Sequence, residues 1–328
     1  MALRGAITGI GAAVPRKVMT NLDFEKFLDT SDEWITQRTG IKERRVAGDG
    51  ETTVTLSVEA ARKALDNAGL KPADLDLIIC ATVSPDMILP ASACFIQKEL
   101  GAGDIPAFDV SAACCGFIYG LSIANQFIAT GTYKRVLLVA GDTLTRFSDF
   151  SDRGSCILFG DGAGAVVLEP TREDGQGVRY TVLHADGGGW DYIYLPGGGS
   201  KHPATKETVE QGMHYLKMRG RDVYKFAVEK MQWLLGDCMG KCGLTIDDVD
   251  MVLPHQVNIR IIVSAAEKFH FPMEKLFTNI DRYGNTSGAS IPIALAEARE
   301  QGKIGAGSTV IVVAFGAGLT WAGAVVRL

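Results

Sequence analysis

The chain of 328 residues repeats its own order of segments, which limits the architectures open to it. Segments beginning at Gly69, Asp74 and Leu137 resemble segments 174 positions later, beginning at Gly243, Asp248 and Ile311. A fourth segment, Ala163–Val167, returns as Ala322–Val326 after 159 positions. In both halves, helix-patterned segments alternate with short continuous apolar runs, which are typical of buried strands. We therefore predict two similar α/β halves, residues 1–172 and 173–328, packed against each other.

Apolar periodicity sets the expected elements. Helices are expected over residues 57–69, 90–100, 117–129 and 289–301, and buried strands over residues 75–81, 105–110 and 135–140. The segment Gly160–Gly164 is interpreted as a turn with close backbone packing. A dinucleotide-binding loop is disfavoured there, because residues 165–168 form an apolar strand where that fingerprint requires a helix.

Composition and charge exclude several classes of protein. The net charge of −5, without a strong basic run, argues against nucleic acid as a partner, although a local basic patch for an acidic protein stays open. Seven cysteines without repeated spacing favour a reducing compartment over a disulfide framework, and Cys238 and Cys242 lack a second pair of zinc ligands. No apolar run reaches the ~18 residues of a membrane span, and Gly5–Val14 is interpreted as a first buried strand rather than a signal peptide.

Cys114 stands between an apolar run that ends at Phe108 and a helix-patterned segment that begins at Phe117. The unpaired N–H groups and the dipole at the start of a helix stabilise negative charge, so we expect the pKa of this thiol to be lowered. The same N–H groups can hold an oxyanion. We interpret Cys114 as an acyl-accepting nucleophile. The alternative is a buried structural cysteine.

The two halves differ where the nucleophile would lie. The position 174 residues after Cys114 is Gly288, within the segment Asn285–Ser290, and the position 174 residues after Ala81 is His255. One half therefore offers a thiol, and the other offers an imidazole and an amide at matching ends of elements. Since sites in α/β proteins form in loops beyond strand ends, we predict that Cys114, His255 and Asn285 converge. Structural roles for His255 and Asn285 are the alternative.

Cys, His and Asn together suit carbon–carbon bond formation through a thioester. The thiol accepts an acyl group. A malonyl thioester then loses carbon dioxide, and a neutral imidazole and an amide NH2 stabilise the enolate oxygen without supplying a proton that would quench it. Backbone N–H groups of Cys114, Ala317 and Gly318 can hold the second oxyanion. A papain-like protease would use the same three groups differently, but the surroundings typical of protease cysteines are absent.

The motif set resembles that of β-ketoacyl-acyl carrier protein synthase III, a thiolase-like condensing enzyme. The segments that carry the resemblance span nearly the whole chain: residues 29–35, Arg38–Ile41, Asp109–Phe117, Asp152–Gly154, Phe159–Gly164, Pro254–Asn258, Gly284–Ser287 and Phe315–Trp321. The resemblance implies a five-layered αβαβα fold, a homodimer and a cytoplasmic location. It also implies condensation of an acyl-CoA primer with malonyl-acyl carrier protein, initiating fatty-acid synthesis, with no cofactor other than the CoA thioester substrate.

By motif match, the resemblance makes Cys114 the nucleophile and His255 with Asn285 the decarboxylation pair. It assigns the binding of CoA to Thr30, Trp34, Arg38, Arg153 and Asn258. An indole and a guanidinium can hold an adenine between them, and arginines can hold phosphates. For Trp34 and Arg38 alone, the alternative is a stacked pair at the surface or an ion pair.

The resemblance also suggests secondary roles. Lys225 and Arg260 are candidates for docking the acidic carrier protein, and Leu89 is a candidate for the acyl pocket, reached from a second copy of the chain. Solvated charges and a core leucine are the alternatives. Cys115 departs from the family pattern, and we expect it to be a packing residue.

Alternatives within and beyond the family stay open. Thiolases proper fit less well, because they use a second cysteine near the C-terminus and none follows Cys242. A condensing enzyme of alkylquinolone or polyketide priming, and a non-catalytic paralogue that binds acyl carrier protein, both remain compatible with the motifs. The length and branching of the primer stay open as well.

Overall fold

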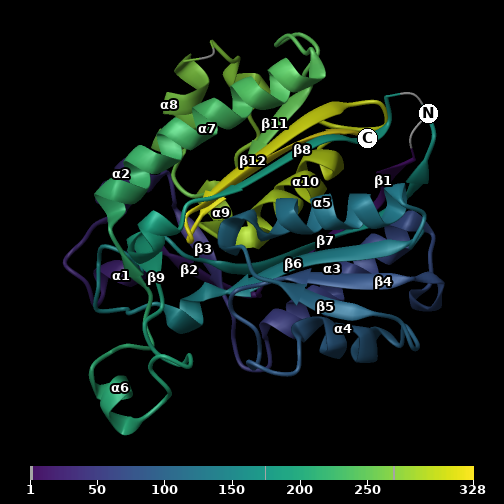
Figure 1. Cartoon of the computed structure of the whole chain (residues 1–328). Helices are drawn as coiled ribbons and strands as arrows, with labels where there is room; N and C mark the ends of the chain where they lie inside the picture. Colours follow the sequence, from purple (N-terminus) through teal and green to yellow (C-terminus); the bar gives the residue numbers. More distant parts are fainter. Residues whose placement is uncertain (1–2, 174, 269) are drawn as a thin grey trace.

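The computed structural model describes residues 3–173, 175–268 and 270–328, in which two β-sheets are stacked with helices between and outside them (Figure 1). The first sheet has the strand order β1-β7-β6-β4-β5 and the second has the order β11-β12-β13-β8. The strands of the first sheet are β1 (Arg4–Ala13), β4 (Leu77–Ala81), β5 (Ala107–Val110), β6 (Val136–Thr143) and β7 (Asp161–Thr171). Those of the second are β8 (Gly177–Ala185), β11 (Met251–Pro254), β12 (Thr309–Gly316) and β13 (Thr320–Arg327).

The second sheet repeats the strand order of the first, with β8, β13, β12 and β11 in the places of β1, β7, β6 and β4. The pairs β4–β6 and β11–β12 are parallel, and the pairs β6–β7 and β12–β13 are antiparallel. Matching strands carry the segments that recur in the sequence, so the repeated α/β order is confirmed. The predicted boundary between residues 172 and 173 falls between β7 and β8 and stays a prediction.

Helices complete a five-layered αβαβα arrangement, as the resemblance implied (Figure 1). The outer face of the first sheet is covered by α3 (Thr53–Ala68) and α4 (Ser92–Leu100). Between the sheets lie α5 (Gly116–Ala129) and α10 (Ser290–Glu300). The outer face of the second sheet is covered by α7 (Gly220–Cys242) and α8 (Ile259–Lys268).

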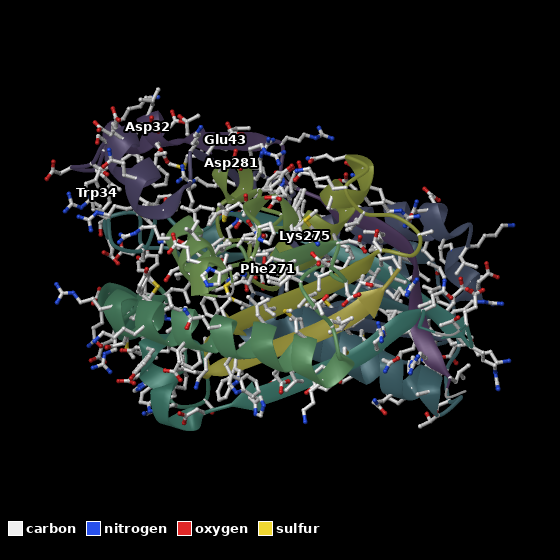
Figure 2. The ribbon with its side chains drawn as sticks, turned by 90° about the horizontal axis from the view of Figure 1, so that it is seen from above. Asp32, Trp34, Glu43, Phe271, Lys275 and Asp281 are labelled. Carbon is white, nitrogen blue, oxygen red and sulfur yellow. The ribbon has the colours of Figure 1, made fainter. Side chains whose placement is uncertain are left out.

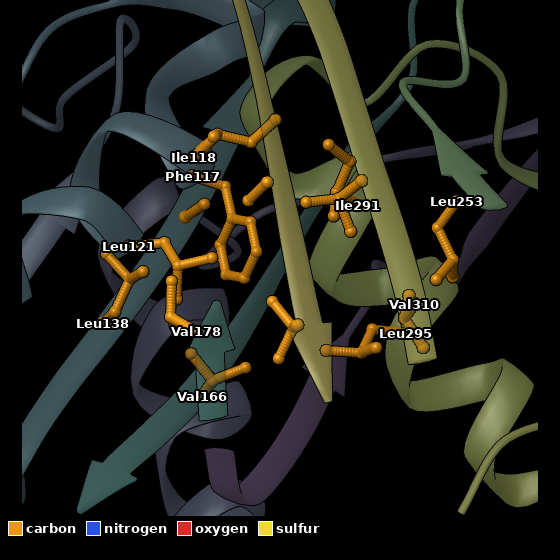
Figure 3. Packing of buried hydrophobic residues seen from close by; sticks show 14 of the residues in the cluster. Phe117, Ile118, Leu121, Leu138, Val166, Val178, Leu253, Ile291, Leu295 and Val310 are labelled. Atoms are coloured by element: carbon orange, nitrogen blue, oxygen red, sulfur yellow. The ribbon is translucent and has the colours of Figure 1, made fainter. Parts of the chain in front are cut away.

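Alternate side chains of the central strands point into different layers. In β6, Leu138 packs with Phe117 of α5 in the central layer, whereas Leu137 packs outward with the residues of α3. In β12, Val310 faces the central layer and Ile311 faces α7. Figure 3 shows Phe117, Leu138 and Val310 in this central layer. Because both faces of each sheet are covered, these strands are continuous apolar runs, and each fully buried side chain contributes roughly 1.5–3 kcal/mol.

The start of α3 lies four residues before its predicted position. The hydroxyl of Thr52 accepts a hydrogen bond from the backbone N–H of Thr55 (3.2 Å), and the hydroxyl of Thr55 accepts one from the N–H of Thr52 (2.8 Å). This reciprocal cap satisfies two N–H groups that would otherwise lack partners. The helix ends as predicted before Gly69, whose φ of +70° suits glycine.

The interpretation of Gly160–Gly164 as a turn is wrong. Residues 161–164 belong to β7 and pair with residues 140–143 of β6. The prediction of close packing is correct, because a Cβ added to Gly164 would lie 2.6 Å from the Cβ of Pro292 on α10. Glycine usually weakens a strand, and here it permits the close approach of a helix backbone.

Two further substructures flank the sheets. Near the N-terminus, β2 (Lys17–Thr20) pairs with β3 (Glu43–Val46), and α1 (Asn21–Glu25) and α2 (Asp32–Thr39) lie between them in sequence. Residues 186–219 form an arm that contains β9 (Ile193–Tyr194), α6 (Lys206–Glu210) and β10 (Lys217–Met218), and in Figure 1 its α6 projects beyond the body. The sequence patterns did not predict this arm.

The remaining elements are short: η1 (Pro72–Asp74), η2 (Ala113–Cys115), η3 (Leu144–Phe147), η4 (Gly187–Tyr192), η5 (Met273–Lys275), α9 (Ile280–Tyr283) and η6 (Ser287–Ala289). Among the helices of the described ranges, none is both long enough and apolar enough to cross a membrane.

Candidate active site

Cys114 lies in η2, the tight turn between β5 and α5, and the matching turn η6 precedes α10. Both turns contain a non-glycine residue in the left-handed region, Ala113 with φ +47° and Ser287 with φ +52°, which are 174 positions apart. Such residues are uncommon and mark a backbone that its surroundings hold in place. A Cβ added to Gly288 would lie 3.3 Å from the carbonyl oxygen of Ala113, so the two turns meet at the nucleophile.

Gly316, at the end of β12, supports the same turn from the second sheet. A Cβ at this position would lie 2.9 Å from the backbone nitrogen of Cys114 and 3.1 Å from its Cβ. Glycine is therefore required for the backbone to approach the nucleophile this closely. The segment that follows contains Ala317, which borders the same cavity as Cys114, and Gly318, which is not among the residues that border it.

His255 follows the last residue of β11 and is almost completely buried. Its Nδ1 lies 2.7 Å from the hydroxyl of Ser290, which also accepts the N–H of Gln256 at 3.4 Å. A neutral ring that accepts the proton of this hydroxyl at Nδ1 carries its own proton on Nε2, where it can be donated to a ligand. Nε2 has no hydrogen-bond partner in the described part of the chain. Burial lowers the pKa of His255 to about 3, so the ring is neutral at physiological pH.

Asn285 is held by its backbone and by its side-chain oxygen. Its N–H donates to the carbonyl of Leu158 (2.8 Å), and its own carbonyl accepts the N–H of Gly160 (3.0 Å). Its Oδ1 accepts the N–H of Ser287 (2.9 Å). Because Oδ1 is an acceptor here, the NH2 of the amide is left as a donor for a ligand.

One cavity brings the three predicted groups together. Cys114, His255 and Asn285 all border it, and it contains about 880 Å³ of space including its open mouth. Its walls are mainly apolar side chains from both halves of the chain. An apolar wall weakens the competition of water for a thioester and strengthens the effect of each hydrogen-bond donor.

The arm of residues 186–219 also lines this cavity, which the sequence patterns did not indicate. Ile193, Leu195, Leu216 and Met218 come from the two short strands of the arm and their flanks. The backbone N–H of Leu216 donates to the carbonyl of Phe147 (2.8 Å), which attaches the arm to the body. The alternation of apolar residues around β9 was the available signal, but two-residue strands are too short to predict from periodicity.

The expected lowering of the pKa of Cys114 is wrong. The pKa of this thiol is raised to about 12, chiefly by burial; the side chain of Ser287 acts against this shift and the nearby charge of Asp142 acts with it. Removal of the thiolate from water in an apolar cavity outweighs the effect of the start of α5. Cys115 is fully buried in the central core, as expected of a packing residue.

Residues at the predicted CoA-binding surface are brought together. The guanidinium groups of Arg38 and Arg153 lie 5.4 Å and 5.0 Å from the centre of the Trp34 ring, and Figure 2 shows Trp34 at an outer edge of the molecule. The side chain of Asn258 donates to the carbonyl of Arg38 (3.0 Å), which joins α2 to the start of α8. Thr30 precedes Ser31, the N-cap residue of α2, and its buried hydroxyl has no hydrogen-bond partner among the described residues.

The other predicted residues are exposed. Leu89 is 78% exposed and does not border the cavity of its own chain, so the alternative of a core leucine is wrong. Its role toward a second copy of the chain stays a prediction. Lys225 on α7 lies among charged neighbours that include Asp222 and Glu229. Arg260 on α8 lies 5.9 Å from the ring of Tyr224, on the adjacent helix.

The chain is similar over almost its whole length to proteins of one family. Models of the family described as 3-oxoacyl-[acyl-carrier-protein (ACP)] synthase III match residues 108–187 and, for its C-terminal part, residues 239–328. The chain is 51% identical over 327 residues to a β-ketoacyl-[acyl-carrier-protein] synthase III of Roseiflexus sp., covering 100% of this chain and 99% of that protein. It is also 50% identical over 325 residues to a β-ketoacyl-[acyl-carrier-protein] synthase III of Caldanaerobacter subterraneus subsp. tengcongensis. This similarity covers 99% of this chain and 98% of that protein.

A solved structure gives the same result. The crystal structure of 3-oxoacyl-[acyl-carrier-protein] synthase III from Aquifex aeolicus is similar to this chain with a TM-score of 0.92 and 44% identity. The similarity covers 99% of this chain and 100% of that one.

Proposed function

Because the chain belongs to the β-ketoacyl-[acyl-carrier-protein] synthase III family, we propose that Cys114, His255 and Asn285 carry out its reaction. The enzyme is an acyltransferase. It condenses an acyl-CoA primer with malonyl-acyl carrier protein and so initiates fatty-acid synthesis. The observation that supports the assignment of residues is the meeting of a thiol and two fixed donors in one apolar cavity.

In the first step, the sulfur of Cys114 attacks the carbonyl of the acyl-CoA. The carbonyl oxygen becomes an oxyanion that the backbone N–H groups of Cys114 and Ala317 stabilise, since both residues border the cavity. The C–S bond to CoA then breaks, CoA leaves as a thiol that carries the proton lost by Cys114, and the acyl group stays on the enzyme as a thioester. The apolar walls protect this thioester from water.

In the second step, the malonyl group loses carbon dioxide. The electron pair of the broken bond forms an enolate, whose oxygen accepts hydrogen bonds from Nε2 of His255 and from the amide NH2 of Asn285. Both donors are neutral, so neither protonates the carbanion readily. The carbanion attacks the acyl thioester, Cys114 leaves as the thiolate and takes up a proton, and the 3-oxoacyl group remains on the carrier protein.

Substrates reach the cavity from the surface near α2 and α8. Trp34, Arg38 and Arg153 form a cationic aromatic surface that suits the adenine and phosphates of CoA. Lys225 and Arg260 suit the acidic carrier protein. We further propose that the enzyme acts in the cytoplasm as a homodimer, with Leu89 directed to the acyl pocket of the second copy. The chemistry requires no cofactor beyond the CoA thioester.

A reconstituted condensation reaction tests the proposal. The purified protein is incubated with acetyl-CoA and malonyl-acyl carrier protein, and the carrier protein is weighed intact while free CoA is measured with a thiol reagent. We expect 3-oxoacyl-carrier protein and stoichiometric CoA. Asn285→Ala is expected to lower turnover by about 10²–10³-fold, the usual cost of a lost oxyanion donor. A carrier protein that is bound but never extended would instead support the non-catalytic paralogue.

A further inference from the structure

Asp142 is a buried carboxylate that the mechanism above does not use. It lies near the end of β6 and is 1% exposed. Its Oδ1 accepts hydrogen bonds from Thr82 Oγ1 (3.0 Å), Val83 N (2.9 Å), Ser84 N (3.2 Å) and Ser84 Oγ (2.8 Å). Its Oδ2 has no such partner within the described ranges, where Asp142 also makes no ion pair. One oxygen is thus anchored and the other is available.

The available oxygen points to the turn that meets the nucleophile. A Cβ added to Gly288 would lie 3.9 Å from Oδ2 of Asp142 and 3.3 Å from the carbonyl of Ala113. Ser287 adjoins Gly288 and borders the same cavity as Cys114, and its buried hydroxyl has no hydrogen-bond partner in residues 3–173, 175–268 and 270–328. The side chain of Ser287 is close enough to lower the pKa of both Cys114 and Asp142.

The thiol of Cys114 needs a group that accepts its proton during acylation. It is protonated at rest, because burial raises its pKa. The ring of His255 is a poor acceptor for this proton, because burial lowers its pKa to about 3. Burial raises the pKa of Asp142, which makes it a stronger base than an exposed aspartate, and the other titratable groups that its charge acts on are the thiols of Cys80 and Cys114.

We propose that Ser287 relays the proton of the Cys114 thiol to Oδ2 of Asp142 when the primer acylates the enzyme. The S–H bond breaks as the sulfur bonds to the acyl carbon, its proton moves to Oγ of Ser287, and the proton of that hydroxyl moves to Oδ2. When the tetrahedral intermediate collapses and the C–S bond to CoA breaks, the proton returns through Ser287 to the departing sulfur. Asp142 is then again a carboxylate. This inference rests on the proposed function and concerns its first half-reaction only.

The relay is tested by measuring acylation and decarboxylation separately. Acylation is followed by rapid quenching with acetyl-CoA and intact mass measurement, and decarboxylation by carbon dioxide release from malonyl-carrier protein in a Cys114→Ala background. Asp142→Asn keeps the shape and the four anchoring bonds, and Ser287→Ala removes one hydroxyl. We expect Asp142→Asn to slow acylation by about 10²-fold and Ser287→Ala by about 10-fold, while decarboxylation changes little.

Ser57→Ala is the matched control. Ser57 is a buried serine of α3 whose hydroxyl also lacks a partner among the described residues, and it lies beside Gly141, the neighbour of Asp142, away from the thiol. It should leave both rates unchanged. Acylation of Asp142→Asn and Ser287→Ala at the wild-type rate would overturn the relay, as would equal losses in both half-reactions. If the wild-type protein itself is never acylated, the proposed function fails and the relay with it.

Discussion

At the residue scale, the hydrogen bonds around the cavity set which atoms can donate. The hydroxyl of Ser290 holds the His255 ring at Nδ1, and the N–H of Ser287 fixes the orientation of the Asn285 amide. Neither of these two hydrogen bonds involves a charged group. The two donors are therefore oriented before substrate binds, which lowers the reorganisation that the reaction requires.

Ser290→Ala is expected to slow decarboxylation by about tenfold, because a buried ring nitrogen that loses its partner costs about 1–3 kcal/mol and the tautomer is no longer fixed. Acylation of Cys114 should be almost unchanged, since His255 has no part in it. The measurement compares carbon dioxide release with acyl adduct formation in the same variant. A loss confined to acylation would contradict this role for Ser290.

The pH dependence of decarboxylation follows from the state of His255. Its pKa of about 3 lies well below the ordinary value of 6.5, so the ring stays neutral as the pH falls from 8 to 5. We expect carbon dioxide release by the Cys114→Ala protein to stay constant over this interval, measured where circular dichroism shows the native fold. A decline with a midpoint near pH 6.5 would mean that the ring titrates normally.

At the element scale, close packing depends on glycines in the strands. Gly164 of β7 lies against Pro292 of α10, whereas Gly240 of α7 has no atom within 4 Å of an added Cβ. Close backbone packing was predicted for the segment that contains Gly164, whereas no prediction was made for Gly240. Their difference comes from the position of a second helix that lies more than a hundred residues away in the chain.

Gly164→Ala is expected to destabilise the protein by about 1–3 kcal/mol, because the added methyl group collides with Pro292. Gly240→Ala is the control, and we expect a small gain of about 0.5–1 kcal/mol from the reduced freedom of the unfolded chain in a helix interior. Urea denaturation of both variants checks this. Equal effects of the two substitutions would contradict the packing described for β7.

The role of α2 can be tested by truncating its indole. Trp34→Ala is expected to raise KM for acetyl-CoA about tenfold, because the stacking of the ring with a base or a guanidinium is lost. With a short acyl-pantetheine thioester that lacks the nucleotide, KM should be the same as in the wild type. An equal rise in KM with both substrates would mean that Trp34 stabilises the fold and does not bind the nucleotide.

The elements differ in how well the sequence predicted them. Strands such as β4 and β6 are continuous apolar runs, so their predicted boundaries lie within three residues of those in the structure. The arm of residues 186–219 was missed because its strands have two residues each. Convergence of Cys114, His255 and Asn285 followed from the internal repeat, because matching elements place matching ends together. Asp142 and Ser287 could not be found, because no spacing signals a buried carboxylate without a charged partner.

At the scale of the whole molecule, buried thiols link stability to alkaline pH. Burial raises the pKa of five cysteines that lie inside the fold: Cys80, Cys114, Cys115, Cys156 and Cys238. In the unfolded chain these thiols titrate near pH 8.5. Above that pH the unfolded state loses protons that the native state keeps, so unfolding becomes more favourable as the pH rises.

We therefore expect the contribution of these thiols to the free energy of unfolding to be constant below about pH 8. Between pH 8.5 and 10 we expect the free energy of unfolding to fall. Urea denaturation at several pH values measures this. Cys80→Ala, which removes one fully buried thiol of β4, should reduce the dependence on pH. A stability that rises over the same interval would contradict the burial of these thiols.

The central claim is that Cys114 accepts the acyl group of the primer. The most direct measurement is the intact mass of the purified protein after incubation with acetyl-CoA, beside the Cys114→Ala variant. We expect one acetyl group on the wild-type protein, none on the variant, and loss of the adduct when malonyl-carrier protein is added. An adduct that persists in Cys114→Ala, or a wild-type protein that gains no mass with any acyl-CoA, would contradict the account.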